Sequence, residues 1–574
     1  MEYLKKYVKK YWKIFLLAVL FLTGEALCDL LQPTIMASII DVGVKNKDIN
    51  YVLVRGGTMI LIAFLGAIAA STRNIIASNV AQRFGAELRL DLFKKVNTLS
   101  FDNMNKFEGA TLVTRLTNDI TQVQGFFMGM MRIFAKAPIL CIGSVIMAVS
   151  LNPRMSLILI AVIPVVGFII SMNMKIGYPF FIKVQKALDT VNSVMREYLS
   201  GVRVVKAFNR FDYEVDRFHI KNEELSSASI KANRVTAVFS PAISLTVNLG
   251  IIAVLWFGGI GVNNGSMRVG QTIAFINYMT QILFSLNIIS NVFSSFIRAK
   301  ASAERIGEVF VVENSMTVPE RTISPDTKSG KVDFEGVSFA YQGSSGELAL
   351  KDISFTCASG ETVGIIGPTG SGKSTLSSLI PRFYDVSSGV VKVDDVNVKD
   401  IDPKELRERI AVVPQKTVLF TGTISSNILW GKENASAEEI EMASKMAQAH
   451  EFISKTPEGY STRLGQGGVN LSGGQKQRMA IARALIKKPE ILILDDCTSA
   501  VDVATEARIK ESLKKYSRGL TTIIIAQRIT SVIDADKIIV LDQGEIVGMG
   551  THDELVKNCQ IYREIFSSQI GQEV

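Results

Sequence analysis

Six long apolar runs occupy the first half of the chain, and each supplies roughly 20 mostly apolar residues, enough to cross a hydrocarbon core of about 30 Å. They begin near Ile14, Val52, Phe127, Met155, Val235 and Thr272. Several lysines precede the first run, as in a secretion signal, but the run continues past Ile40 without a small-residue cleavage pattern. The pattern therefore predicts six membrane-spanning helices, the first of them retained.

Two polar stretches between these runs have helical character. Residues 81–124 and 183–233 are charged, poor in glycine and proline, and apolar at helical spacing. We therefore expect the spanning helices to continue out of the membrane into water. Twenty further helical residues would extend a helix by about 30 Å. Each stretch has a break at its tip, near residues 101–103 and 209–212. Composition alone describes a pair of solvated helical hairpins.

The second half of the chain has a different pattern. Residues 313–331 are polar and contain Pro319 and Pro325, as expected of a linker. Beyond them, short β-rich runs alternate with helical segments, which predicts a mostly parallel sheet of α/β type. A hairpin turn is expected at residues 542–545. The predicted strands are residues 362–366, 410–413, 491–494, 521–525 and 537–541.

Composition agrees with a membrane protein that has a large soluble part. The 574 residues are 48% hydrophobic, and the mean hydropathy is +0.26. The net charge of +9 is not gathered in an arginine-rich stripe with aromatics, so nucleic-acid binding is not expected. A positive cytoplasmic face explains the charge and places the N-terminus and the C-terminal half in the cytoplasm. The five cysteines are scattered without metal spacing and are expected to be reduced thiols.

The strongest motif is G-x-x-x-x-G-K-S, which directly follows predicted strand 362–366 and precedes a helix, as a phosphate-binding P-loop requires. Its backbone N–H groups can close on phosphate oxygens, Lys373 can reach the β- and γ-phosphates, and the Ser374 hydroxyl can ligate Mg²⁺. The strand at residues 491–494 ends in Asp495, a further ligand for the metal or its water shell. The predicted ATP-binding residues are Gly367, Pro368, Thr369, Gly370, Ser371, Gly372, Lys373, Ser374 and Thr375.

A second anion site lies between the P-loop and Asp495. Ser472, Gly473, Gly474 and Gln475 open a helical segment, and the free N–H groups of a helix start attract phosphate. With the preceding leucine they spell LSGGQ, which resembles the signature of the ATP-binding cassette (ABC) family. The whole chain resembles the exporters of that family, in which a six-helix membrane domain precedes the ATPase.

This resemblance implies a domain organisation. We expect an all-α transmembrane domain of six helices with long cytoplasmic extensions at residues 1–315, a linker at 316–330, and an α/β P-loop nucleotide-binding domain at 331–574. Coupling regions near residues 101–106 and 208–214 would press on the nucleotide-binding domains.

The resemblance also implies roles for three more side chains. Tyr341 would stack on adenine, although an edge-strand tyrosine is the plainer interpretation. Gln415 would contact Mg²⁺ and the attacking water. Asp502 belongs to a D-loop that crosses to the partner's site.

Two positions depart from the family pattern. Asp496 stands where the family has a glutamate as general base, and Gln527 stands where it has a switch histidine. The aspartate side chain is shorter than that of glutamate by about 1.5 Å, and a correctly positioned general base contributes roughly 10²–10⁴ to the rate. At the second position, glutamine cannot carry a proton as histidine can. The alternative is two tolerated substitutions in a self-sufficient enzyme.

These departures resemble the heterodimeric bacterial multidrug exporters, which pair one altered and one consensus ATP site. The chain is then expected to require a second, different half-transporter. Its own ATP site would be slow, and its LSGGQ would complete the partner's site.

The substrate is less determined. Glu25 and Asp29 lie four residues apart on one face of the first spanning helix, where acids are costly. They could attract a cationic amphiphile, or they could pair internally with Arg132 and Lys136. The leading function is multidrug-type export of small amphiphilic compounds across the cytoplasmic membrane of a bacterium. A dedicated peptide or lipid exporter and an ATP-gated channel or regulatory subunit are the alternatives.

Overall fold

The computed structural model describes residues 2–317, 319, 321–341, 346–516 and 519–570. The chain divides into two compact units. One contains Met1–Asn97 and Gly109–Val312, and the other contains Glu313–Val574 together with Thr98–Glu108. The short segment between the second and third spans therefore belongs to the C-terminal unit.

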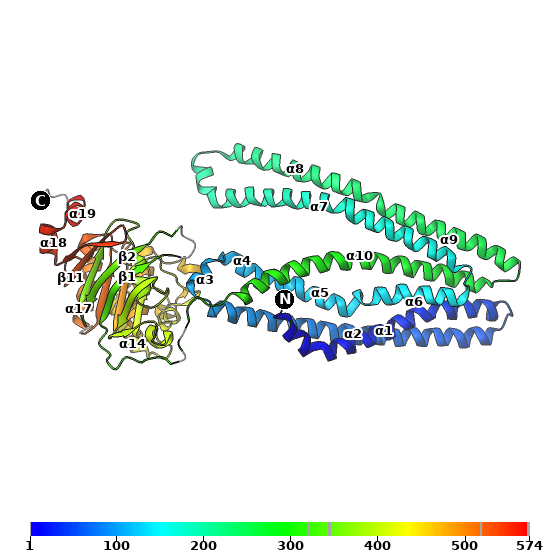
Figure 1. Cartoon of the computed structure of the whole chain (residues 1–574), viewed down its shortest axis with the longest axis horizontal. Coiled ribbons are helices and arrows are strands. Elements are labelled where there is room, and N and C mark those ends of the chain that lie inside the picture. Colours follow the sequence, from blue (N-terminus) through cyan, green and yellow to red (C-terminus); the bar gives the residue numbers. More distant parts are fainter. Residues whose placement is uncertain (1, 318, 320, 342–345, 517–518, 571–574) are drawn as a thin grey trace. The chain divides into compact units, whose positions relative to one another are not determined.

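The first unit is built from helices, and six of them are long and apolar enough to cross a membrane, which confirms the predicted six spans. The spans cover Leu4–Val44, Ile49–Thr98, Gly109–Leu151, Ser156–Ala207, Phe211–Asn263 and Val269–Ile289. The elements are α1 (Leu4–Ser38), η1 (Ile39–Val44), α2 (Ile49–Thr98), α4 (Gly109–Thr114), η2 (Arg115–Asp119), α5 (Ile120–Gly129), η3 (Met130–Phe134), α6 (Lys136–Leu151), α7 (Ser156–Ala207), α8 (Phe211–Ala237), α9 (Phe239–Asn263) and α10 (Val269–Val311) (Figure 1).

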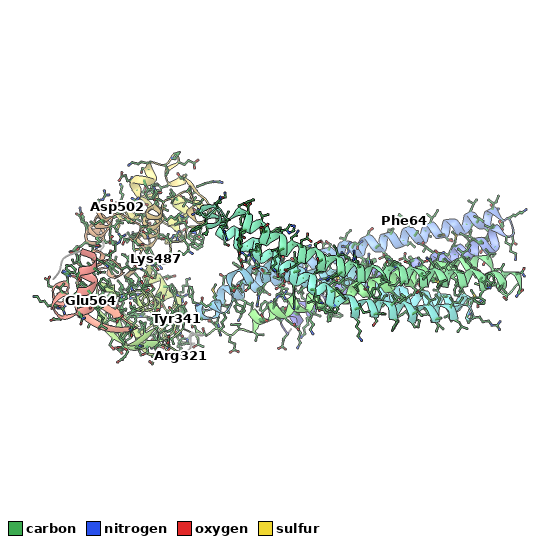
Figure 2. The ribbon with its side chains drawn as sticks, turned by 90° about the horizontal axis from the view of Figure 1, so that it is seen from above. Phe64, Arg321, Tyr341, Lys487, Asp502 and Glu564 are labelled. Atoms are coloured by element: carbon green, nitrogen blue, oxygen red, sulfur yellow. The ribbon has the colours of Figure 1, made fainter. Side chains whose placement is uncertain are left out.

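Apolar side chains cover the outside of these helices as well as their core. Ile60 is 72% exposed, Phe64 62% and Trp256 70%, and Figure 2 marks Phe64 on its helix. Inside the unit, Phe275 and Tyr278 of α10 are fully buried in a core shared with α1, α6, α7 and α9. Helices that are apolar all round belong in lipid or against other spanning helices.

The helices continue beyond their apolar parts, as the spacing of apolar residues predicted. Helix α7 has 52 residues, which corresponds to about 78 Å at 1.5 Å per residue. Helices α7 and α8 run antiparallel, and they are joined by a turn in which Asn209 has a positive φ of 51° (Figure 1). The other break follows Thr98, where α2 ends.

The second unit contains a six-stranded sheet in the order β12-β11-β3-β10-β9-β6. All its neighbours pair in parallel except the edge strand β12. The five predicted strands all lie in this sheet. The predicted hairpin joins β11 to β12 through Gln543 and Gly544, which both have positive φ.

A four-stranded antiparallel sheet, in the order β2-β1-β4-β5, was not predicted. It shares one hydrophobic core with the parallel sheet and α11, to which Phe334, Ile365 and Leu376 contribute. That shared core fixes the end of β3 and the start of α11, between which the P-loop lies.

The strands of this unit are β1 (Val332–Phe339), β2 (Leu350–Cys357), β3 (Thr362–Ile366), β4 (Ser388–Val393), β5 (Val396–Asn397), β6 (Ile410–Val413), β7 (Gly422–Thr423), β8 (Arg463–Leu464), β9 (Ile491–Asp495), β10 (Thr521–Ile525), β11 (Lys537–Asp542) and β12 (Glu545–Gly550). Its helices are α3 (Phe101–Asn105), α11 (Lys373–Leu379), α12 (Pro403–Arg409), α13 (Ile424–Leu429), α14 (Ala437–Met446), α15 (His450–Ser454), η4 (Gly459–Ser461), η5 (Gln466–Gly468), α16 (Gly473–Leu485), α17 (Val503–Tyr516), η6 (Ile529–Ser531), α18 (His552–Asn558) and α19 (Gln560–Ile570).

The short helix α3 packs on the surface of this unit. The ring of Phe101 lies 4.9 Å from that of Phe383 and 6.0 Å from that of Tyr384, measured between centroids. Asn105 Nδ2 donates to the Tyr384 hydroxyl over 3.2 Å. Aromatic contacts of this kind hold α3 in a defined position on this unit.

Candidate active site

The P-loop turns sharply between β3 and α11, and its glycines are needed for that turn. A Cβ at Gly367 would collide with the carbonyl oxygen of Leu541. Gly372 has a φ of +97°, and a Cβ there would lie 2.7 Å from the carbonyl oxygen of Ala349. The backbone is therefore closely packed on its outer side, and only residues without a side chain fit these two positions.

Lys373 lies inside this loop. It is only 8% exposed, and its Nζ donates to the carbonyl oxygens of Gly367 (2.8 Å) and Pro368 (2.7 Å). Burial lowers the pKa of Lys373, against the opposing effect of the two acids at the end of β9. A buried ammonium group held only by neutral oxygens suits an anion such as a phosphate.

Ser374 and Asp495 meet at the opening of the loop. The Ser374 hydroxyl donates to Asp495 Oδ1 over 3.1 Å, and burial raises the pKa of Asp495. A hydroxyl and a carboxylate side by side provide the hard oxygen ligands that Mg²⁺ prefers, and a bound cation would offset the cost of the buried carboxylate. These residues fit a Mg²⁺–phosphate ligand.

The neighbouring Asp496 has hydrogen-bond partners of its own. Its backbone has a φ of 44°, which few non-glycine residues adopt, and its N–H donates to the carbonyl oxygen of Ile525 over 2.8 Å. Its carboxylate Oδ2 accepts a 3.1 Å hydrogen bond from Gln415 Nε2. Gln415 thus joins the site from the loop after β6.

Tyr341 follows β1 and reaches the helix α11 that begins at the P-loop. Its hydroxyl is 3.0 Å from the Thr375 hydroxyl, and its ring packs edge-on against Phe339 and Tyr384. The side chain remains 37% exposed. An aromatic ring next to a phosphate loop is in a suitable place to stack on a nucleotide base.

LSGGQ opens α16 through a capping box. The Ser472 hydroxyl accepts from the Gln475 N–H over 3.3 Å, while Gln475 Oε1 accepts from the Ser472 N–H over 2.9 Å. In the described part of the chain, no hydrogen bond or ion pair joins this turn to the P-loop. The helix start is ordered and leaves the N–H groups of Gly473 and Gly474 for an anion.

The D-loop is fastened to the same helix. Gln477 Nε2 donates to the Ser499 hydroxyl (3.2 Å), and Gln477 Oε1 accepts from the Ala500 N–H (2.9 Å). Asp502 accepts from the Thr505 N–H over 2.9 Å at the start of α17, a bond that lowers the pKa of Asp502. The signature helix and the D-loop are therefore joined by two hydrogen bonds.

The C-terminal helix α19 contacts the loop that carries Gln527. Sequence patterns did not predict this connection. Gln569 Nε2 donates to the carbonyl oxygen of Gln527, and Gln569 Oε1 accepts from the Ile529 N–H, both over 2.8 Å. Between them, Arg528 donates to the Ser499 carbonyl oxygen over 3.0 Å. One amide side chain thus fixes the switch loop, and the loop in turn contacts the D-loop.

Glu25 and Asp29 are paired inside the first unit. Lys136 Nζ lies 2.6 Å from Glu25 Oε1 and 2.7 Å from Asp29 Oδ2. Arg73, which the sequence did not single out, lies 3.1 Å from Glu25 Oε2. Arg132 contacts neither acid and instead donates to Asn74 Oδ1 over 3.0 Å. Both acids thus form ion pairs within the first unit, with Arg73 in the place expected for Arg132.

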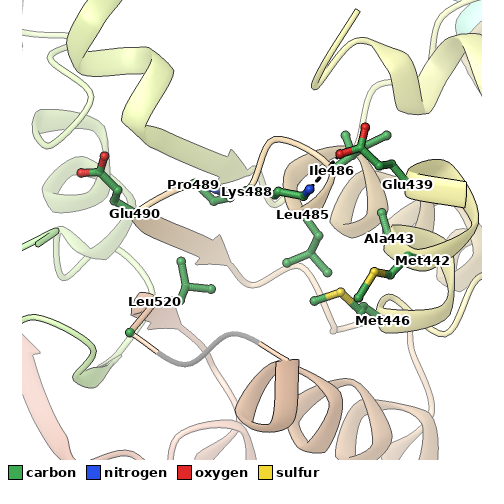
Figure 3. Close-up of a pocket in the computed structure, with 11 residues that line it drawn as sticks. Glu439, Met442, Ala443, Met446, Leu485, Ile486, Lys488, Pro489, Glu490 and Leu520 are labelled. Carbon is green, nitrogen blue, oxygen red and sulfur yellow. Dashed lines mark hydrogen bonds and ion pairs between the residues drawn. The ribbon is translucent and has the colours of Figure 1, made fainter. Parts of the chain in front are cut away.

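A separate hollow of about 380 Å³ lies between α14, the end of α16 and the start of β10 (Figure 3). Apolar side chains line it, including Met442, Met446 and Leu485, and Lys488 pairs with Glu439 at its edge (2.8 Å). None of the predicted nucleotide-binding residues lines this hollow. It is therefore not the site described above.

Comparison with known proteins decides the family. The model of the ABC transporter transmembrane region matches residues 15–286, and the ABC transporter model matches residues 350–499. YfiB of Bacillus subtilis, described as an uncharacterized ABC transporter ATP-binding protein, is 41% identical over 567 residues, which cover 99% of this chain and 98% of YfiB. The chain belongs to the ABC transporter family.

Other members of the family match over their whole length. An ATP-dependent lipid A-core flippase of Chromohalobacter salexigens is 34% identical over 570 residues, 99% of this chain and 98% of that protein. The structure of a bacterial Atm1-family ABC exporter with ATP bound superposes with a TM-score of 0.80 at 25% identity, over 100% of this chain and 99% of the other. This ABC exporter half-transporter therefore has its membrane domain and its ATP-hydrolysing domain fused in one chain.

Proposed function

We propose that this chain is the slow-hydrolysing half of a heterodimeric exporter for small amphiphilic compounds. The observation that carries the proposal is the bond from Gln415 to Asp496. A general base must reach the attacking water, and here the carboxylate is one methylene short and is already bound to an amide. Gln527 at the switch position cannot take up a proton either.

The same site keeps what ATP binding requires. Lys373 would bind the β- and γ-phosphates, Ser374 and Asp495 would hold Mg²⁺ with Gln415 nearby, and Tyr341 would stack on adenine. When bound, Mg²⁺ would neutralise charge that develops on the phosphates. The chain is then expected to bind ATP tightly and to hydrolyse it slowly.

The signature turn is proposed to serve the ATP of a second, different half-transporter. Its support is the ordered start of α16, which binds to no part of this chain's own P-loop in the described residues. Ser472 would contact the γ-phosphate bound to the partner, and Asp502 would reach the same interface from the D-loop, which Gln477 ties to α16.

The exporter is proposed to lie in the cytoplasmic membrane of a bacterium, with its N-terminus and ATP-binding domain in the cytoplasm. The six apolar spans support a substrate that enters from the bilayer. Lipid export is a second candidate, because the flippase of Chromohalobacter salexigens is 34% identical over nearly the whole chain.

The test compares the purified chain alone with the chain co-purified with a consensus half-exporter of the same genome. We expect the single chain to bind a fluorescent ATP analogue and to hydrolyse ATP at least about a hundredfold more slowly than the pair, given the contribution of a positioned base. A single chain with the turnover of the pair would contradict the proposal.

A further inference from the structure

Charged side chains from three spans meet in the first unit, and their charges do not balance. Glu25 and Asp29 carry two negative charges, whereas Arg73, Arg132 and Lys136 carry three positive charges. Lys136 lies within ion-pair distance of both carboxylates and Arg73 within ion-pair distance of Glu25, so these two cations are paired with the two acids. One positive charge is left over.

The unbalanced charge belongs to Arg132. Its Nε donates to Asn74 Oδ1 over 3.0 Å, and its backbone carbonyl oxygen accepts from Arg73. Among the residues for which the structure gives coordinates, no carboxylate lies within ion-pair distance of its guanidinium group. The Arg132 side chain is exposed, whereas Glu25 and Arg73 are 9% and 6% exposed.

The depth of the cluster can be counted along the helices. Lys45, where the first span ends, follows Glu25 by 20 residues, which corresponds to about 30 Å of helix. Leu151, the end of α6, follows Arg132 by 19 residues, or about 28 Å. The first apolar run begins near Ile14. Leu16, Leu17 and Leu20, which precede Glu25, are exposed apolar side chains. The cluster therefore lies inside the apolar part of the spans, where a charge without an acidic partner is costly and indicates a functional site.

We propose that Arg132 receives an anionic group, a phosphate or a carboxylate, of the amphiphile that this exporter moves; the inference rests on the proposed function. A guanidinium group binds either anion through two parallel hydrogen bonds. Arg73 donates to the backbone carbonyl oxygen of Arg132 and so holds that helix turn. Arg73 and Lys136 together neutralise the two acids that would otherwise compete with the ligand. Amphiphilic anions are then preferred over the cations that Glu25 and Asp29 suggested.

The experiment uses the assembled exporter in phosphatidylcholine proteoliposomes and three fluorescent probes. They are a phosphatidic acid, its zwitterionic phosphatidylcholine counterpart and a cationic rhodamine. ATP-dependent translocation is measured against probe concentration. We expect the phosphatidic acid to be moved at the lowest concentration, and Arg132→Gln to raise its half-saturating concentration by about tenfold or more, as for loss of a charge-assisted bond. Arg132→Lys should give an intermediate half-saturating concentration, because it keeps the positive charge but loses the two parallel N–H donors of the guanidinium group.

Arg55→Gln is the matched control. Arg55 lies in α2 and stacks on Tyr51 near the opposite end of the span, so its loss should leave all three curves unchanged. Inorganic phosphate is added as a competitor, and it should compete far more weakly than the lipid probe. If inorganic phosphate competed as strongly as the lipid probe, the ligand of Arg132 would be a soluble anion and not an amphiphile.

Several outcomes would overturn the inference. An equal effect of Arg132→Gln on the anionic and zwitterionic probes, or no effect on either, would show that Arg132 does not distinguish substrates by their charge. Dissociation of the subunits in size-exclusion chromatography would assign Arg132 to a carboxylate of the partner. Transport of the rhodamine alone would overturn this inference but leave the proposed function standing, whereas transport of no amphiphile would overturn both.

Discussion

The amide of Gln415 donates to Oδ2 of Asp496 over 3.1 Å and so joins the loop after β6 to the end of β9. In the ABC exporter described here, this bond lies beside the Ser374–Asp495 pair that suits Mg²⁺. A carboxylate that is short and already bound is a poor base. This bond supports the proposal that the site binds ATP and hydrolyses it slowly.

Restoring the consensus side chains should restore hydrolysis in this chain alone. Asp496→Glu extends the carboxylate by about 1.5 Å, and Gln527→His adds a group that can carry a proton. We expect the first change to raise ATP turnover of the purified chain by about tenfold, and both together by about 10² or more. Turnover is measured by phosphate release, with Lys373→Ala in the same background as a control that should abolish it. No gain in the double variant would refute this explanation of the slow site.

Loss of the Gln569 amide should loosen the switch loop. Gln569→Leu removes both 2.8 Å bonds to the loop, and because Arg528 links that loop to Ser499, turnover of the assembled exporter should fall several-fold. The KM for ATP should change little, since the P-loop is untouched. Gln569→Glu keeps the acceptor for Ile529 and should be milder.

The control for Gln569 lies on the same helix. Gln560 is exposed and bonds only to Glu564 in the described structure, so Gln560→Leu should leave kcat unchanged. If Gln569→Leu and Gln560→Leu gave the same kcat, α19 would have no part in positioning the switch loop.

Truncating Phe101 should uncouple hydrolysis from transport. The ring packs on Phe383 and Tyr384, so Phe101→Ala should lower substrate transport by about tenfold while most ATPase activity persists. Met104, on the same short helix and 39% exposed, provides the control Met104→Ala. Parallel loss of both activities in Phe101→Ala would instead indicate a general folding defect.

Asp394 should make the stability of the second unit depend on pH. Burial alone raises the pKa of Asp394, but hydrogen bonds from Ser329, Lys331 and Arg409 outweigh burial and hold it below its ordinary value. Because the unfolded chain then takes up the proton more readily, the stabilisation is present at neutral pH and is lost as pH falls below about 4.

The corresponding variant is Asp394→Asn, which leaves Arg409 with Glu490 as its carboxylate partner. We expect it to cost about 1–3 kcal/mol at pH 7, as for loss of a hydrogen bond to a charged group, and to flatten the loss of thermal stability between pH 5 and pH 3. Asp395→Asn, at an exposed neighbouring acid, should cost about 0.5 kcal/mol or less. Equal effects of the two variants would contradict the role of the buried pair.

Local patterns predicted much of this molecule because the responsible forces are local. Apolar runs long enough for a bilayer mark the spans, and the sheet strands at residues 362–366 and 491–494 are short buried runs that end in motif residues. The P-loop and LSGGQ were found for the same reason, since each concentrates its chemistry in a few consecutive residues.

Contacts between distant segments were not predictable in this way. Gln569 meets the switch loop about 40 residues earlier, and nothing in its own helix marks it. Arg73 was not predicted, because α2 continues far beyond its apolar part. The sequence alone therefore does not show that Arg73 lies at the same level as Glu25 on the neighbouring helix. The antiparallel sheet was missed because β5 is only two residues long and β1 is irregular in register.

The proposed asymmetry of the two ATP sites is tested most directly by comparing variants in the assembled exporter. Ser472→Ala removes the side-chain hydroxyl that is proposed to contact the γ-phosphate of the hydrolysed ATP. ATP turnover should therefore fall steeply. Ser436→Ala is the control, because it removes an equivalent capping box from α14 and should leave turnover unchanged. Lys373→Ala should be intermediate, because loss of ATP at the slow site weakens the dimer.

Asp496→Asn is the decisive member of the set. It alters a base that is already misplaced, and we expect steady-state ATPase activity to change by only a few-fold, against the roughly 10²–10⁴ for removal of a working base. If Asp496→Asn proved as damaging as Ser472→Ala, this chain's own site would be the working one and the asymmetric mechanism would be wrong.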